Sequence, residues 1–177
     1  MNDKKLVSDL LTKSLEDLNN KTKDLSQLEL VYQPKNGGWS IINCLEHMAV
    51  TEKFLLNAIR ETIKARSVMP NLNLSKNDAS ILIKIGDRAN KVESSKEFCP
   101  SIDNKNRTHL DFLDEIESNR QETINEFNST QVDLRKKAMP FAFWDKVDLH
   151  QMFLVIGSHM VRHTLQIESV LNEIKTN

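Results

Sequence analysis

The chain has few of the residues that shape loops and crosslinks: four glycines, four prolines and two cysteines in 177 residues. This scarcity favours long uninterrupted helices, because glycine and proline both weaken or end a helix. The two cysteines, Cys44 and Cys99, are too few and too far apart for a disulfide framework or a cysteine-rich zinc site. We therefore expect a helical chain in a reducing compartment.

Long apolar runs and a strong net charge are also missing. Residues 1–15 lack the continuous apolar core of a signal peptide, and no apolar run reaches membrane-spanning length. The formal net charge of −1 does not indicate a polyanionic partner such as nucleic acid. Hydrophobic residues make up 39% and charged residues 28%, an ordinary soluble balance. We expect one cytoplasmic domain over residues 1–177, with neither a membrane nor a nucleic acid as partner.

Four segments carry apolar residues at steps of three and four, the spacing of a helix with one buried side. They cover residues 4–30, about 41–68, about 106–127 and 149–174. Ser40 is expected to cap the second helix, because its hydroxyl can accept from an unpaired amide of the first turn. The sequence therefore predicts an all-α four-helix bundle.

Two connectors between these segments are distinctive. Residues 70–105 separate the second and third helices, which is long for a compact domain. Within them ASILIKIGDRANKV, residues 79–92, fits either a short helix or a strand, and its periodicity does not decide. The second connector, KKAMPFAFWDKV at residues 136–147, is aromatic. Such crossovers make the second and fourth helices candidates for neighbours in the bundle.

Two histidines, His159 and His163, lie inside the apolar side of the last predicted helix. Four helical steps turn by about 400° and rise by about 6 Å, so the two rings fall within about 40° of each other. Both rings can reach one metal ion, and a third ligand must then come from another helix. His47, at the edge of the apolar side of the second helix, is the best candidate. The alternative is that all three are core histidines hydrogen-bonded to neighbours, and spacing alone leaves both interpretations open.

Several other chemistries are excluded by missing motifs. The chain has no H-E-x-x-H of a zincin protease and no Glu-x-x-His pair of a ferritin-like di-iron site. It also lacks G-x-S-x-G, a P-loop and G-x-G-x-x-G. His109 and His150 lie near helix starts, where we expect ordinary solvated side chains. Glu52 lies close to the apolar side of the second helix and is a candidate for a buried hydrogen-bonding partner.

Two segments resemble the DinB-like superfamily. WSIINCLEHMAVTEKFL, residues 39–55, is similar to the W-S-x-x-x-x-x-x-H segment that opens the second helix of that superfamily. GSHMVRHTLQI, residues 157–167, is similar to its H-x-x-R-H-x-x-Q-I signature in the last helix. The resemblance spans most of the chain, is specific at these two segments and is vague through the middle connector. It implies an up-down-down-up four-helix bundle with a long connector between helices two and three.

The resemblance also implies a divalent metal, often nickel or zinc, bound by three histidines that correspond to His47, His159 and His163. Three imidazoles suit copper, iron and other divalent metals as well, so the spacing does not identify the ion. Similar proteins include thiol-dependent S-transferases and isomerases that use low-molecular-weight thiols such as bacillithiol or mycothiol. Since similar proteins commonly dimerise, a homodimer is also expected.

The resulting hypothesis is a metal-dependent enzyme, an S-transferase or a related hydrolase, that acts on a small molecule with a low-molecular-weight thiol as cosubstrate. The expected pocket residues are Trp39, Asn43, Phe143, Trp144 and Arg162. None of them offers an obvious general base, which favours thiol transfer over hydrolysis. The alternative is a non-catalytic bundle that binds a metal or another ligand. Arg162, with Asp87 and Arg88, is also a candidate for binding an anionic group, although solvated or helix-surface roles explain these residues more simply.

Overall fold

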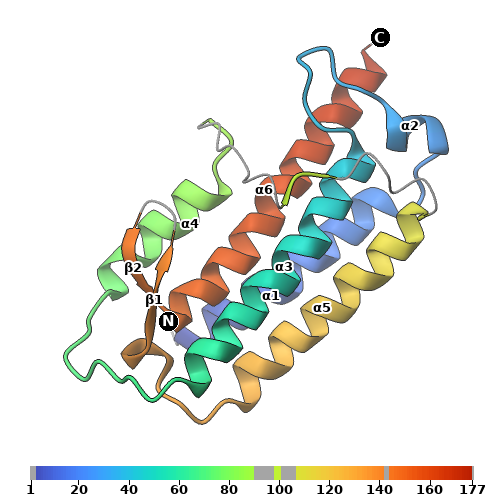
Figure 1. The fold of residues 1–177 in the computed structure, drawn as a ribbon. Helices are drawn as coiled ribbons and strands as arrows, with labels where there is room; N and C mark the ends of the chain where they lie inside the picture. The colour runs from blue at the N-terminus through green and yellow to red at the C-terminus, as the bar shows by residue number, and fades with distance from the viewer. Residues whose placement is uncertain (1–2, 90–97, 101–106, 142–143, 177) are drawn as a thin grey trace.

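The computed structural model describes residues 3–89, 98–100, 107–141 and 144–176, which form a mostly helical molecule (Figure 1). The long helices are α1 (Asp3–Thr22), α3 (Ile41–Lys64), α5 (His109–Ser129) and α6 (Leu149–Lys175). The shorter elements are α2 (Gln27–Val31), η1 (Ser75–Asn77), α4 (Asp78–Gly86), η3 (Leu134–Lys136), β1 (Ala138–Phe141) and β2 (Trp144–Asp148). The helical class predicted from the sequence is confirmed. The structure also contains one small β-hairpin, which was not predicted.

Each long helix packs against two of the others. Helix α1 contacts α5 and α6, and α3 contacts the same two helices from the other side. Figure 1 shows α1 and α6 running in one direction and α3 and α5 in the opposite direction, with α4 packed on the outside of α6. Helices α3 and α6, which carry the candidate metal ligands, are therefore direct neighbours.

Side chains that accept from first-turn amides fix the start of the helices. Ser40 accepts from the amide of Asn43, and the Asn43 side chain accepts in return from the Ser40 amide. The predicted cap of this helix is thus confirmed. Asp148 forms the same reciprocal arrangement at the start of α6, with Gln151. Each cap stabilises its helix by about 1 kcal/mol and sets where α3 and α6 begin.

The first helix is shorter than the predicted span of residues 4–30. Helix α1 ends at Thr22, and Ser26 begins the separate helix α2 by accepting from the amide of Glu29. The Glu29 carboxylate accepts from the Ser26 amide at 2.8 Å, which completes a capping box. A serine that binds the backbone in this way favours a helix start over a helix interior, so the continuous prediction was wrong.

The connectors contain more regular structure than the sequence indicated. The ambiguous segment 79–92 is helical as far as Gly86, where α4 ends. The aromatic connector forms an antiparallel hairpin, in which Ala138 pairs with Asp148 and Met139 with Val147. Four- and five-residue strands carry too little alternation to be recognised from the sequence. The hairpin leads directly into the cap of α6.

Helices α1 and α6 approach each other closely at Gly157. A Cβ atom at this position would lie 2.6 Å from Cγ of Leu10, closer than two carbon atoms can pack. Glycine inside a helix costs roughly 1 kcal/mol relative to alanine, and here its small size permits the close helix contact. The contact lies two residues before His159, so it also fixes the position of that histidine relative to α1.

Buried apolar residues form two clusters, one beside the hairpin and one at the opposite half of the bundle. Ile59 and Phe153 belong to the first cluster, and Cys44 and Met160 belong to the second. On α6 the boundary falls between Ile156 and Met160, where His159 projects. The candidate site therefore lies at the junction of the two clusters.

A buried polar network crosses the bundle between the clusters. The fully buried guanidinium of Arg120 donates to both carboxylate oxygens of Glu52, at 2.8 and 2.9 Å. It also donates to the Leu11 carbonyl at 2.6 Å and to the Ser14 hydroxyl at 2.7 Å. The Thr123 hydroxyl adds a third hydrogen bond to Glu52, at 2.9 Å. The predicted buried role of Glu52 is confirmed, and its network joins α1, α3 and α5.

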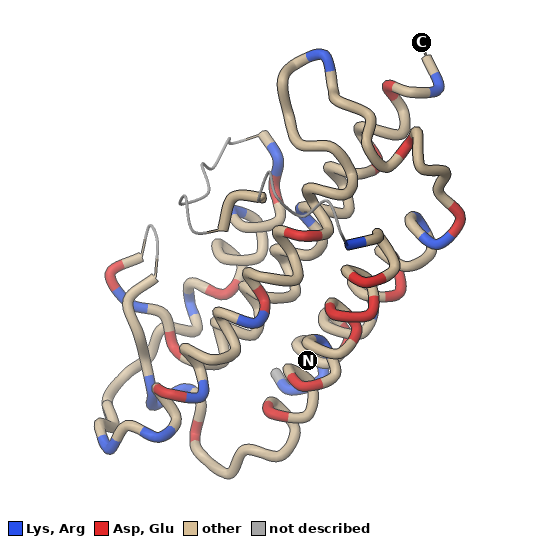
Figure 2. The backbone as a smooth tube through the Cα atoms, turned by 45° about the vertical axis from the view of Figure 1, so that its right-hand side comes forward, with Lys and Arg blue, Asp and Glu red and all other residues tan. Residues whose placement is uncertain are grey.

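Acidic residues gather along α5 (Figure 2). Two of them, Glu122 and Glu126, accept hydrogen bonds from Arg60 of α3, each at 2.9 Å. These ion pairs join α3 to α5 near the surface of the molecule. Within the described part of the chain, no helix has both the length and the apolar character needed to cross a bilayer.

Candidate metal centre

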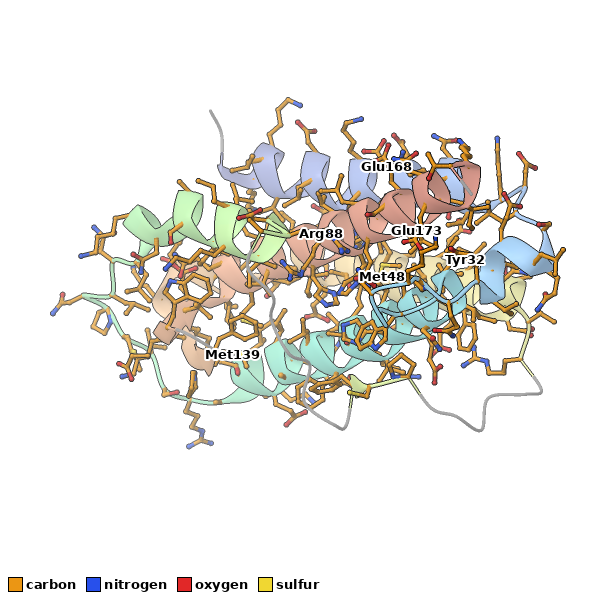
Figure 3. The ribbon with its side chains drawn as sticks, turned by 90° about the horizontal axis from the view of Figure 1, so that it is seen from above. Tyr32, Met48, Arg88, Met139, Glu168 and Glu173 are labelled. Atoms are coloured by element: carbon orange, nitrogen blue, oxygen red, sulfur yellow. The ribbon has the colours of Figure 1, made fainter. Side chains whose placement is uncertain are left out.

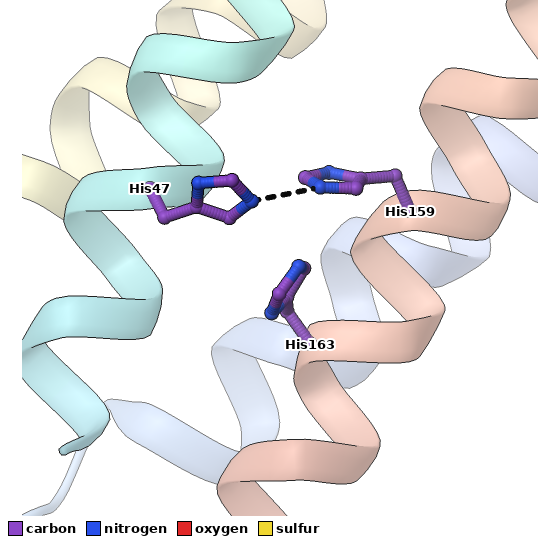
Figure 4. A group of neighbouring side chains, drawn as sticks. All are labelled: His47, His159 and His163. Atoms are coloured by element: carbon purple, nitrogen blue, oxygen red, sulfur yellow. Dashed lines mark hydrogen bonds between the residues drawn. The ribbon is translucent and has the colours of Figure 1, made fainter. Parts of the chain in front are cut away.

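Three histidines from two helices meet inside the molecule. His47 lies in the second turn of α3, and His159 and His163 lie one turn apart on α6. One ring nitrogen of each histidine lies within 4.8 Å of the corresponding atoms of the other two. Figure 4 shows the three rings turned toward one another from the facing sides of α3 and α6. His47 and His163 are buried, with 5% and 6% of their surface exposed.

The ring of His47 is oriented by a backbone carbonyl. Its Nδ1 lies 2.7 Å from the carbonyl oxygen of Phe98, which can only accept a hydrogen bond, so Nδ1 carries the proton. The lone pair of the neutral ring is then on Nε2. That atom lies 3.0 Å from Nε2 of His159 (Figure 4). The backbone of Phe98 therefore aims one lone pair of His47 at His159.

The ring of His163 has a similar partner. Its Nδ1 lies 3.1 Å from Oε1 of Gln166, one turn further along α6. An amide oxygen accepts, so this contact also places the proton on Nδ1 and the lone pair on Nε2. Second partners of this kind fix the orientation and tautomer of histidines that bind metals.

The spacing of the His47 and His159 nitrogens fits two ligands of a single bound ion. With metal–nitrogen distances of about 2.0–2.1 Å, two ligands of one ion lie about 2.9–3.4 Å apart for octahedral or tetrahedral geometry. The Nε2 atoms of His47 and His159 fall within this range at 3.0 Å. Two bare lone pairs at this distance would repel each other, so a proton or a cation must lie between them. The donor set therefore fits a divalent metal.

All three imidazoles are held in the neutral form. Burial lowers the pKa of His47, and the hydrogen bond to the Phe98 carbonyl opposes this only in part. Burial, followed by the charges of His47 and nearby arginines, lowers the pKa of His159 to about 3. The pKa of His163 lies well below its usual value for the same reasons, with burial first. At neutral pH each ring thus keeps one unprotonated nitrogen that is available to a cation.

Among the described residues, neither a carboxylate nor a thiol joins the three imidazoles. Three protein ligands leave at least one coordination position for a guest molecule, as in catalytic rather than structural zinc sites. Neutral ligands also leave the charge of a divalent ion uncompensated. The arrangement therefore suits a guest that binds as an anion.

Trp39 forms one wall of the centre. Its ring is nearly parallel to that of His163, with centroids 6.0 Å apart, and its centroid lies 4.7 Å from that of His47. The residue directly precedes the capping box of α3, which holds it in place. In that box the Oδ1 atom of Asn43 accepts from the hydroxyl of Ser40 at 2.8 Å. Of these two predicted pocket residues, Trp39 packs on the histidine rings and Asn43 caps the helix.

The other predicted pocket residues lie at different places. Arg162 lies between the two histidines of α6 and donates from Nη1 to the carbonyl oxygen of Asp87, at the end of α4. Trp144 is in the hairpin, where it stacks on Phe141 at 6.4 Å and packs against the first apolar cluster, away from the cluster of Cys44 and Met160. Phe143 lies outside the described residues. Strand pairing places Trp144 in the hairpin, and its role as a pocket residue stays a prediction.

Two hydrogen-bond partners of the histidines were not predicted from the sequence, and neither was the burial of His150. The role of Phe98 comes from its carbonyl oxygen, which leaves no signature in the sequence. Gln166 was noted as part of the α6 motif without a role, although its position three residues after His163 was a usable signal. His150 was expected to be solvated, but only 5% of its surface is exposed, and the ring of Phe127 packs against it.

Comparison with known families supports this reading of the site. A sequence profile of the DinB superfamily matches residues 10–167, a range that includes all three histidines. No curated protein and no solved structure matches the chain. Membership of that superfamily and the three-histidine cluster are together compatible with a metal-binding protein.

Proposed function

The chain belongs to the DinB superfamily, and from this membership and its three converging imidazoles we propose a metal-dependent enzyme that acts on a small molecule. His47, His159 and His163 would hold one divalent ion, with nickel and zinc as the first candidates. The proposal includes the up-down-down-up four-helix bundle as a single cytoplasmic domain.

One observation carries the proposal. Nε2 of His47 lies 3.0 Å from Nε2 of His159 while its own Nδ1 is committed to the Phe98 carbonyl. A core histidine satisfied by protein partners needs only one donor at its second nitrogen. Here that nitrogen faces a second imidazole and a third lies within reach of both, so the group offers three nitrogens to one ion.

When bound, the ion supplies a positive charge that favours the deprotonated form of a thiol or of water. The residues of the chain position the ligands and exclude solvent. The Phe98 carbonyl and the Gln166 side chain orient two of the imidazoles, and Trp39 covers their rings. These contacts support a preorganised site whose open coordination position receives the small molecule.

We propose thiol transfer as the reaction. The thiol releases its proton to solvent, its sulfur forms a bond to an electrophilic carbon, and the leaving group departs with the electron pair of the broken bond. Hydrolysis would profit from a general base, and no carboxylate joins the cluster among the described residues. This favours a low-molecular-weight thiol over water as the nucleophile.

The experiment compares wild type, His159→Ala and the control His109→Ala, which changes a histidine outside the cluster. Each protein is loaded with zinc or nickel, and the consumption of several thiols by monochlorobimane is followed. We expect acceleration above the uncatalysed rate for wild type and the control, and none for His159→Ala. Flat traces from wild type with stoichiometric metal would instead support the alternative, a non-catalytic metal-binding bundle.

A further inference from the structure

A small cavity with a volume of about 40 Å³ lies beside the site. Trp39, Arg88, Gln166 and Ser169 are among the residues that line it. Two of these residues also contact His163, Trp39 through its ring and Gln166 through Oε1 at 3.1 Å. The cavity therefore adjoins side chains that contact one of the three histidines.

Arg88 gives the cavity a positive charge. It follows α4 directly, is exposed to solvent, and has no ion-pair or hydrogen-bond partner within the part of the chain that the structure describes. Figure 3 shows it beside α6, on the side where α4 packs. Arg162 of α6 is a second cation close by, because the charge of Arg88 contributes, after burial, to lowering its pKa.

The remaining lining residues favour an anion as well. The Oε1 atom of Gln166 is committed to His163, which leaves its NH₂ group as a donor. The Ser169 hydroxyl is exposed and supplies another donor. Among the described residues of the lining, Glu173 alone is acidic, and its Oε1 already accepts from the Tyr32 hydroxyl and the Lys35 amide, both at 2.9 Å. Its charge is thus directed at the loop that follows α2.

We propose that this cavity binds a carboxylate group of the low-molecular-weight thiol whose sulfur reaches the three histidines. This inference rests on the proposed function, and it adds the chemical class of that thiol. Room for a few water-sized groups matches about three heavy atoms, the size of a carboxylate. A guanidinium presents a planar fork of donors to a carboxylate, with the Gln166 and Ser169 donors beside it. Trp39 would pack on the apolar carbons that link the carboxylate to the reactive group.

The test uses two thiols that differ in charge. Cobalt-loaded protein is titrated with 3-mercaptopropionate and with 2-mercaptoethanol, and the sulfur-to-metal charge-transfer band reports binding without turnover. We expect wild type to bind the carboxylate thiol about 10-fold more tightly than the neutral one. Arg88→Gln should remove most of this preference and leave the affinity for 2-mercaptoethanol unchanged. Arg66→Gln, an exposed arginine after the far end of α3, is the control for a general loss of charge.

Different results would contradict the carboxylate site and the proposed function. Equal affinity of wild type for the two thiols, or equal losses in Arg88→Gln and Arg66→Gln, would overturn the carboxylate site and leave metal-dependent thiol binding intact. A charge-transfer band that appears with neither thiol in wild type would overturn the proposed function and this inference with it.

Discussion

The Nε2 atoms of His47 and His159 lie 3.0 Å apart, although 112 positions separate the two residues in the sequence. Helices α3 and α6 pack directly against each other, and their caps fix where each of them begins. The proton on Nδ1 of His47 is bound to the Phe98 carbonyl, so the lone pair of that ring faces inward. The candidate site thus results from helix packing together with one backbone hydrogen bond.

Removal of the Gln166 side chain should weaken metal binding. In Gln166→Ala the Nδ1 proton of His163 loses its acceptor, so the ring loses its fixed orientation. Loss of a hydrogen-bond partner of a metal-binding histidine typically lowers metal affinity about 10–100-fold. Competition with a chromophoric chelator measures the change, and Gln121→Ala on the exposed side of α5 is the control. Identical affinities of Gln166→Ala and wild type would show that Gln166 does not orient the ring.

The buried pair of Glu52 and Arg120 should respond differently to single and double substitution. Glu52→Leu leaves an uncompensated buried guanidinium and should lower the free energy of unfolding by about 3–5 kcal/mol. Arg120→Met leaves an unpaired carboxylate with a similar cost. The double variant removes both charges and should recover most of the loss, as measured by urea denaturation. Additive losses in the double variant would contradict this account of the network.

The two cysteines should differ in reactivity. Burial raises the pKa of the Cys44 thiol to about 12, whereas Cys99 is exposed. Since the thiolate is the reactive form, Ellman's reagent should modify one thiol per native chain and two after unfolding in guanidinium chloride. Cys99→Ser should show no reactive thiol in the native state. Rapid reaction of both native thiols would place Cys44 outside the core.

Asp78 should make stability depend on pH in the acid range. Burial raises the pKa of this carboxyl, but hydrogen bonds from Arg135 and Gln151 outweigh that effect and hold its pKa below the usual 3.8. A lowered pKa in the folded state gives stability that is fully present above about pH 4 and lost as the pH falls through the folded-state value. Asp78→Asn should therefore be less stable than wild type by about 1–3 kcal/mol at pH 7.

Urea denaturation of both proteins between pH 7 and pH 3 measures the Asp78 contribution. The difference between wild type and Asp78→Asn should stay constant from pH 7 to pH 5 and shrink below pH 4. Asp17→Asn, in an exposed pair with Lys13 on α1, is the control and should show little difference at any pH. A gap that widens toward low pH would mean that the sign of the Asp78 shift is wrong.

The sequence was sufficient to predict the two helices that carry the histidines. Apolar residues every three or four positions indicated α3 and α6, and the four-residue step from His159 to His163 placed both rings on one side of a helix. The S-x-x-E pattern of Ser26 and Glu29 was also present as a signal for a helix start. The leucine periodicity on both sides of it hid that signal, so α1 was predicted to be too long.

Other features depend on tertiary contacts that have no local pattern. The partner of His47 is a backbone carbonyl, which every residue possesses, so nothing in the sequence marks Phe98. Strand pairing over a few residues places Trp144 in the hairpin, and packing against Phe127 accompanies the burial of His150. Arg88 follows α4, and only the packing of α4 on α6 places it in the same cavity lining as Trp39 and Gln166.

An anomalous-difference map from a crystal of zinc- or nickel-loaded protein tests the central claim most directly. The account predicts one peak per chain, at about 2.0–2.1 Å from the Nε2 atoms of His47, His159 and His163, with no such peak in His159→Ala. A loaded crystal without a peak at this position, or with the ring of His47 turned away from the other two, would contradict it.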